Sequence, residues 1–247
     1  MLFALLLGPA AYPGEGSAGA SLPARVLFVG NSFTYYNNSL HNHFRRLTAA
    51  AEILPEGSTR ARIMTISGGH LPEHAGGFES VLSGDAWDVV VLQGHSLGPI
   101  SEETAPAFRE AASRFAGIAR EQGVRPVFFM TWAYTGAPEM TAELDGAYTA
   151  IGRELNAEVA PVGLAFARVT LERPDIALRT DDLRHPTLAG TYLAACTFYA
   201  VLYQQTPEGL SYDAGLAAEL AGYLQRVAWE TATAYAARGD AAVSYVE

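Results

Sequence analysis

Cysteine is almost absent from this sequence: Cys196 is the only one among 247 residues, so no internal disulfide can form. Cys196 lies in the apolar run 194–198, and we expect it to be a small buried side chain. Without crosslinks, stability has to come from a hydrophobic core. The chain is long enough to bury one, and 49% of its residues are hydrophobic.

Clusters of basic residues are also missing. The chain has 16 Lys and Arg residues against 26 Asp and Glu residues, a formal net charge of −10. No stretch is rich in Lys and Arg, and no aromatic residues alternate with basic ones. This composition argues against nucleic acid and anionic membrane surfaces as partners, although net charge alone identifies no substrate.

The N-terminal apolar run is too short for a membrane anchor, because a spanning helix needs about 20 apolar residues. The run is followed by small residues that end in Ala18-Gly19-Ala20, an A-x-A cleavage pattern. We therefore predict a signal peptide over residues 1–20, one domain over 21–247, a secreted or periplasmic location and no stable membrane insertion. A misassigned start or a disordered leader is the alternative, since no Lys or Arg precedes the run.

Apolar runs then alternate with amphipathic stretches. The runs cover residues 26–29, 63–66, 89–92, 127–130 and 159–162. Continuous apolar runs suit parallel strands that are covered on both faces, and the stretches between them have helical spacing. Two longer helical segments follow, over 188–203 and from 216 to about 238. The pattern predicts an α/β three-layer sandwich with a five-stranded parallel sheet.

The residues that follow the strands matter most, because ligands of open parallel sheets bind beyond the carboxyl ends of the strands. None of these turns has the glycine spacing of a nucleotide site. Aromatic side chains near the strand ends either stack on a substrate or pack in the core. They are Tyr35, Tyr36, Trp132 and Tyr134.

One turn places Ser32 directly after the first apolar run. A serine hydroxyl needs a nearby base to become a nucleophile, and the base is usually a histidine oriented by a carboxylate. Asp182 and His185 are three residues apart, close enough to share one turn, and Pro186 suits the start of the following helix. Asp181 is the alternative carboxylate.

Three short motifs of this sequence resemble those of a known hydrolase family. GNSFT after the first strand, the glycine turn after the second and DLRHP near the C-terminus resemble the SGNH branch of the GDSL esterase and lipase superfamily, over about residues 25–203. The resemblance implies a flavodoxin-like fold and a Ser-His-Asp hydrolase of acyl esters, often acetylated sugars or lipids. Ser32 would be the nucleophile, His185 the base and Asp182 its orienter, with no metal or organic cofactor.

The chain departs from the family pattern in two places. Asn31 replaces the usual aspartate before the serine, and the segment after the third strand, Gln93 to Ser96, lacks the family's asparagine. The oxyanion of the tetrahedral intermediate needs aimed donors. We expect the backbone N–H groups of Ser32 and Gly68 to supply two and the Gln93 amide a third, with His95 as the alternative.

The sequence thus favours a serine esterase that acts on O-acyl groups, chiefly acetyl, on carbohydrate. Two other functions stay open. Four histidines have spacings seen among zinc ligands, which would suit a metal-dependent hydrolase: His41, His43, His70 and His74. A glycan-binding protein that has lost turnover is the non-enzymatic alternative, because fold alone does not decide activity.

Overall fold

The computed structural model describes residues 22–243, without the side chains of residues 239–243. The expected signal peptide over residues 1–20 lies outside this range, and so do residues 244–247. Within it, no helix combines the length and the apolar character that crossing a membrane would require.

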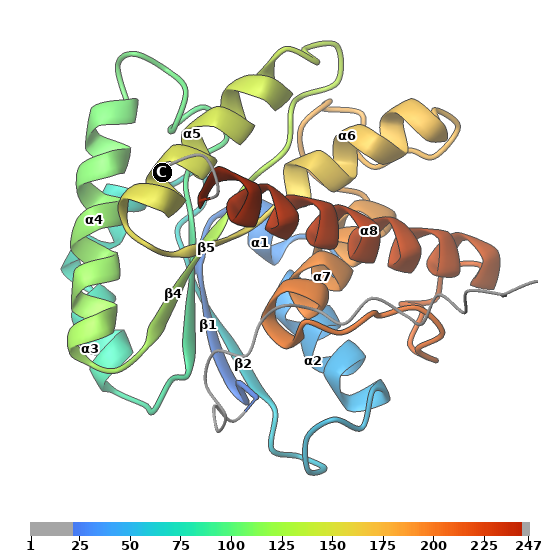
Figure 1. The fold of residues 1–247 in the computed structure, drawn as a ribbon, viewed down its shortest axis with the longest axis horizontal. Coiled ribbons are helices and arrows are strands. Elements are labelled where there is room, and N and C mark those ends of the chain that lie inside the picture. Colours follow the sequence, from blue (N-terminus) through green and yellow to red (C-terminus); the bar gives the residue numbers. More distant parts are fainter. Residues whose placement is uncertain (1–21, 244–247) are drawn as a thin grey trace, which may run out of the picture.

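A five-stranded parallel sheet forms the centre of the fold, in the order β2-β1-β3-β4-β5 (Figure 1). Its strands are β1 (Arg25–Gly30), β2 (Arg60–Thr65), β3 (Val89–Gln93), β4 (Arg125–Phe129) and β5 (Glu158–Ala160). The chain order reverses between β1 and β3, which are neighbours and place Val29 opposite Leu92. This arrangement confirms the predicted fold class, and ligands of such sheets bind at the reversal point.

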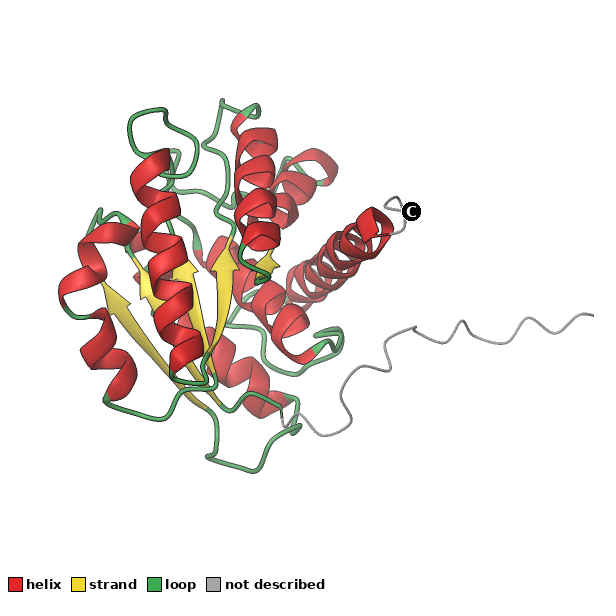
Figure 2. Cartoon of the chain, turned by 60° about the vertical axis from the view of Figure 1, so that its left-hand side comes forward, coloured by secondary structure: helices red, strands yellow, loops and turns green. Residues whose placement is uncertain are grey.

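Both faces of the central strands β1, β3 and β4 are buried, which explains their continuous apolar runs. Val26 and Phe28 of β1 belong to one core and Leu27 and Val29 to the other, because side chains alternate along a strand. The first core is shared with α2 (Leu40–Ala50), α6 (Val162–Glu172) and α7 (Leu188–Tyr203). The second is shared with α3 (Phe78–Ser83), α4 (Ala105–Glu121) and α5 (Met140–Glu154). Figure 2 shows the two helical layers around the strands.

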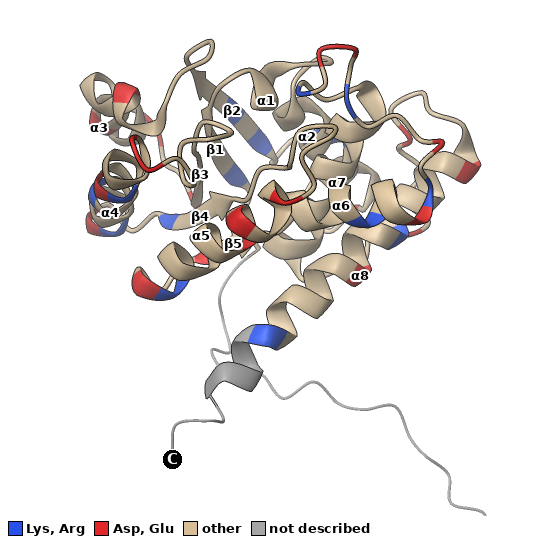
Figure 3. Cartoon of the chain, turned by 90° about the horizontal axis from the view of Figure 1, so that it is seen from above, with Lys and Arg blue, Asp and Glu red and all other residues tan. Residues whose placement is uncertain are grey.

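The remaining helices complete this frame. Helix α8 (Ala218–Val243) packs on α7 and α6 rather than on the sheet. Two short helices, α1 (Ser32–Tyr35) and η1 (Leu71–Gly76), follow β1 and the turn after β2. Cys196 is a free, buried thiol on α7, as expected. In the view of Figure 3, acidic and basic residues are interspersed over the helices.

The last predicted strand, over residues 159–162, is wrong at its end. The strand stops at Ala160, and α6 begins at Val162. Pro161 explains the change, because it has no N–H to donate to a sheet ladder. The first turn of α6 packs closely on the backbone that follows β4. The Gly163 N–H donates to the Met130 carbonyl (3.0 Å), and a Cβ at Gly163 would overlap the Thr131 carbonyl oxygen.

We therefore expect Gly163→Ala to destabilise the fold, because the added methyl group meets rigid backbone. The overlap should cost about 1–3 kcal/mol and lower the Tm by roughly 2–12 °C in thermal unfolding. Gly146→Ala on α5 is the control, since no atom lies within 4 Å of its added Cβ. That variant should gain up to about 1 kcal/mol. Equal Tm values for the two variants would contradict the packing at α6.

Candidate active site

Ser32 stands at the carboxyl edge of the sheet, on the first turn after β1. The Asn31 side chain caps α1 by accepting a hydrogen bond from the Phe33 N–H (3.1 Å). Because β1 is buried and the helix starts at once, Ser32 is held on a rigid element rather than on a mobile loop. Its side chain is largely buried.

A buried amide network clamps this turn. Asn31 Nδ2 donates to the Gly69 carbonyl (3.0 Å), while Asn31 Oδ1 accepts from Gln93 Nε2 (2.7 Å). Gln93 Oε1 accepts in turn from Thr34 Oγ1 (2.7 Å) and the Asn31 N–H (3.3 Å). A Cβ at Gly30 would overlap Gln93 Oε1, so glycine leaves the space for this network. The ends of β1, β2 and β3 are thus joined around Ser32.

This network removes Gln93 from the expected set of oxyanion donors. Its amide hydrogens are donated to Asn31 Oδ1 and to the Gly94 carbonyl (3.1 Å), and the side chain is 1% exposed. A third donation would require breaking one of these buried bonds, which is costly. Gln93 therefore orients Asn31 and Thr34, and the expectation that it completes the oxyanion hole is not supported by the geometry.

The loop before α7 brings the predicted Asp182 and His185 to Ser32. Asp182 Oδ1 accepts from the N–H groups of Arg184 and His185 (2.9 Å each) and from Thr180 Oγ1 (2.8 Å), and Asp182 Oδ2 contacts His185 Nδ1. On the other side of the ring, His185 Nε2 lies 2.8 Å from Ser32 Oγ. Asp182, not the alternative Asp181, is therefore the carboxylate on the imidazole.

The charge state of Asp182 follows from these contacts. Its hydrogen bond with His185, followed by those from the Arg184 and His185 backbone and from Thr180, holds the pKa of the carboxyl well below its usual range. Asp182 is consequently ionised throughout the pH range in which a histidine acts as a base.

Aromatic packing fixes the His185 ring. Tyr36 stacks on it at 4.3 Å with an 8° interplanar angle, and Phe33 meets it edge-on at 5.7 Å. Trp132 is fully buried between Phe33 and Phe166, and its Nε1 donates to the Arg184 carbonyl (2.9 Å). Trp132 thus supports the loop that carries Asp182 and His185, which is called the catalytic loop below. Because its side chain is fully buried, Trp132 cannot stack on a substrate.

Asn37 is a site residue that the sequence reasoning missed. Its Nδ2 donates to the Pro186 carbonyl (2.7 Å) and to Thr191 Oγ1 (2.8 Å), which joins the nucleophile segment to the histidine segment. Asn37 has a φ of +52° and begins a run of three residues with positive φ, completed by Asn38 and Ser39. The Asn-Asn pair was the available signal, because asparagine tolerates this conformation better than most residues.

Two backbone donors are available near Ser32. Among the hydrogen bonds of residues 22–243, none is donated by the N–H of Ser32 or of Gly68, and Gly68 has a φ of +65°. Both predicted backbone positions thus have an N–H that is free to bind an oxyanion.

His95, two residues after β3, offers a side-chain donor. Its Nδ1 accepts from the Leu97 N–H (3.4 Å), which places the proton of the neutral ring on Nε2. Burial, and then the nearby His70 and Arg184, lower the pKa of His95. The ring is therefore a neutral donor near pH 7.

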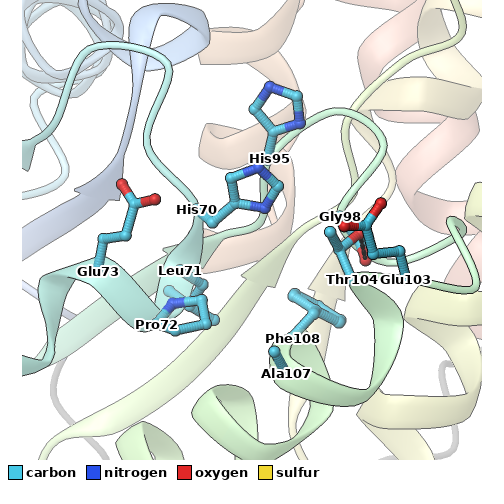
Figure 4. Close-up of a pocket in the computed structure, with 10 residues that line it drawn as sticks. All are labelled: His70, Leu71, Pro72, Glu73, His95, Gly98, Glu103, Thr104, Ala107 and Phe108. Atoms are coloured by element: carbon cyan, nitrogen blue, oxygen red, sulfur yellow. Dashed lines mark hydrogen bonds between the residues drawn. The ribbon is translucent and has the colours of Figure 1, made fainter.

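A hollow of about 260 Å³ lies beside this histidine. Figure 4 shows His70 and His95 close together at its upper side, where their rings stack at 4.4 Å, and Phe108 at its base. Glu73 and Glu103 add carboxylates to the lining. The hollow is polar at the rim and apolar below, as small-molecule sites commonly are.

The four histidines of the metal hypothesis do not come together. His43 contacts the Tyr212 hydroxyl (2.8 Å) and the Asn37 carbonyl (2.7 Å). His74 instead contacts the carbonyls of Gly30 (3.0 Å) and Leu71 (3.3 Å). His41 contacts Ser39, and His70 stacks on His95. In the part of the chain that the structure describes, no three His, Cys, Asp or Glu side chains are grouped to hold a metal ion.

No protein-family model matches this chain, and a search of curated proteins finds no match. Solved structures do match. A protein from Slackia heliotrinireducens, described as an SGNH hydrolase, is 25% identical, with a TM-score of 0.58 over 69% of this chain and 94% of that one. A DUF4886 family protein from Bacteroides uniformis is 18% identical, with a TM-score of 0.67 over 83% and 93% of the two chains.

A variant of an acetyl xylan esterase from Geobacillus stearothermophilus is 14% identical, with a TM-score of 0.57 over 76% of this chain and 95% of that one. Other matches include a lipolytic protein of the G-D-S-L family and a lipase/acylhydrolase from Enterococcus faecalis. The Slackia protein, at 25% identity, supports a hydrolase. The predicted resemblance to the SGNH/GDSL hydrolase superfamily is confirmed, and this chain has the SGNH hydrolase fold.

Proposed function

We propose that this protein is a serine esterase that hydrolyses O-acyl esters, chiefly acetyl esters, on carbohydrate. The observation that carries the proposal is the 2.8 Å contact between His185 Nε2 and Ser32 Oγ, with the Asp182 carboxylate on the opposite ring nitrogen. The acetyl xylan esterases among the structures of the same fold support the choice of substrate class.

In this mechanism Ser32 Oγ attacks the ester carbonyl carbon while His185 Nε2 accepts the hydroxyl proton. Asp182 stabilises the imidazolium that forms. His185 then donates the proton to the leaving alcohol oxygen, which leaves an acyl group on Ser32. Water, deprotonated by His185, attacks the acyl carbon and releases the acid.

The N–H groups of Ser32 and Gly68 bind the oxyanion, and His95 Nε2–H takes the place that the sequence suggested for Gln93. Val29 and Leu92 are paired across β1 and β3, so Ser32 and His95, each three residues further on, emerge at the same end of the sheet. A neutral imidazole donor suits an oxyanion, because each aimed donor lowers the barrier by about 3 kcal/mol.

The location of the enzyme also stays a proposal. The A-x-A pattern after the apolar leader supports a secreted or periplasmic protein.

Replacing the nucleophile tests the proposal most directly. Ser32→Ala should lower the kcat for an aryl acetate by roughly 10⁶-fold, as removal of the serine does in a serine protease, because no group remains to attack the carbonyl. Ser83→Ala, at the end of α3, is the control and should retain wild-type activity. Turnover that survives in the Ser32 variant and disappears with a chelator would instead indicate a metal enzyme. A wild-type protein inactive on every acyl length would favour the glycan-binding alternative.

The role of Asp182 can be separated from that of its neighbour. Asp182→Asn should lower kcat by roughly 10⁴-fold, the loss that the same change causes in a serine protease triad. Asp181→Asn should leave kcat unchanged, and steady-state kinetics at pH 7 measures both. Equal activity losses in the two variants would contradict the assignment.

Asp182 also makes a pH-dependent contribution to stability. Because folding lowers its pKa, the ionised carboxylate stabilises the fold above the unfolded value of about 3.9 and loses this effect as the pH falls below it. The Tm difference between wild type and Asp182→Asn should therefore shrink as the pH falls below about 4, which thermal unfolding at pH 5 and pH 3 measures.

The third oxyanion donor is tested by comparing His95 with Gln93. His95→Ala should lower kcat by about 10²–10³-fold with little change in KM or Tm, because the donor acts in the transition state. Gln93→Ala should mainly lower the Tm, since it leaves the buried Asn31 N–H and Thr34 hydroxyl without their acceptor, Gln93 Oε1. The reverse outcome, lost kcat at an unchanged Tm for Gln93→Ala and full kcat for His95→Ala, would return the role to Gln93.

A further inference from the structure

Leu183 is an exposed apolar side chain inside the catalytic loop. It lies between Asp182 and His185 in the chain and is 50% exposed. The other exposed large apolar side chains in the described residues are Ile66, Val81 and Leu97, each below 40% exposed, and Leu171. Leu183 alone among them stands within two residues of a member of the triad.

Leu183 also has an unfavourable backbone conformation. Its φ of +68° is in the left-handed region, which is uncommon for a bulky side chain and is adopted more readily by glycine or asparagine. The conformation is held from both sides: the Leu183 N–H donates to the Thr180 carbonyl (2.8 Å), and the Thr135 N–H donates to the Leu183 carbonyl (2.9 Å). Neither burial nor backbone geometry accounts for leucine here, and such strain is typical of functional sites.

The backbone of Leu183 is bound to the segment that follows β4. Thr135 succeeds Tyr134, whose hydroxyl contacts Ser96 Oγ (2.5 Å) in the segment after β3. The Arg184 guanidinium lies over the Tyr134 ring, 5.8 Å from its centroid. Leu183 therefore supplies apolar surface beside a polar and cationic rim.

The mechanism decides which part of an ester this surface meets. The proposed oxyanion donors follow β1, β2 and β3, so the carbonyl oxygen faces that side of Ser32. The leaving oxygen must face His185 Nε2, because that nitrogen protonates it. Leu183 belongs to the loop of His185, and the alcohol moiety is thus the part of the substrate on its side.

We propose that Leu183 binds the alcohol moiety of the ester, and that this alcohol presents an apolar face next to the ester oxygen, such as the C–H face of a sugar ring or an aromatic ring. The inference rests on the proposed function and refines its substrate class. Covering a half-exposed leucine side chain accounts for roughly 3- to 10-fold in kcat/KM.

The test compares substrates that differ only in the alcohol or only in the acyl group. Leu183→Asn keeps a residue that tolerates positive φ but removes the apolar surface. It should lower kcat/KM for phenyl acetate by roughly 3- to 10-fold, chiefly through KM, and change that for ethyl acetate less than 2-fold. The ratio of phenyl acetate to phenyl butyrate activity should stay at the wild-type value, and the Tm should not fall.

Leu171→Asn is the matched control, because Leu171 near the end of α6 is 84% exposed and lies outside the catalytic loop. It should leave all three substrates unaffected. An equal loss on phenyl and ethyl acetate, a changed acyl ratio, or no loss at all in Leu183→Asn would each overturn the inference. Failure of the proposed function is distinguishable, because it would appear as activity that does not depend on Ser32 or as a wild-type protein that is inactive on all three esters.

Discussion

The hydrogen bond between His185 and Ser32 joins residues 153 positions apart in the chain, and the local structure on both sides serves to hold its two ends. Ser32 is immobilised by the end of a buried strand and a capped helix. His185 is immobilised by Asp182, by the Tyr36 ring and by a loop whose backbone is bound to Trp132. The proton transfer proposed for this pair tolerates little positional error, so this rigidity suits the proposed mechanism.

The buried amide network of Asn31 and Gln93 explains how a sheet edge can present polar groups without losing stability. Each buried nitrogen and oxygen of these two side chains has a partner, so burial leaves no unsatisfied group. The same completeness prevents Gln93 from serving as a substrate donor. In this active site, the side chains that position the nucleophile are therefore distinct from those that remain free for chemistry.

Much of the fold and part of the site followed from local pattern. The central strands β1, β3 and β4 were anticipated because a strand buried on both faces has to be continuously apolar, as in residues 89–92. The edge strand β2 is partly exposed and covers residues 60–65, so the apolar run over 63–66 predicted its position only in part. The prediction failed where Pro161 ended the last strand early, and it left Trp132 undecided, because aromatic character does not reveal whether a side chain faces solvent or core. Asn37 was missed because its partners, Pro186 and Thr191, are far away in the sequence.

By itself, the sequence determined the layer architecture and pointed to Ser32 and His185, because hydrophobic periodicity and short motifs are local properties of the chain. Only the tertiary structure decided between Asp181 and Asp182, excluded Gln93 as a free donor and left the neutral His95 as the better one. It also showed that Leu183 is exposed beside the triad. The physical reason is that hydrogen-bond saturation and exposure depend on which distant segments meet, and residue type does not record this.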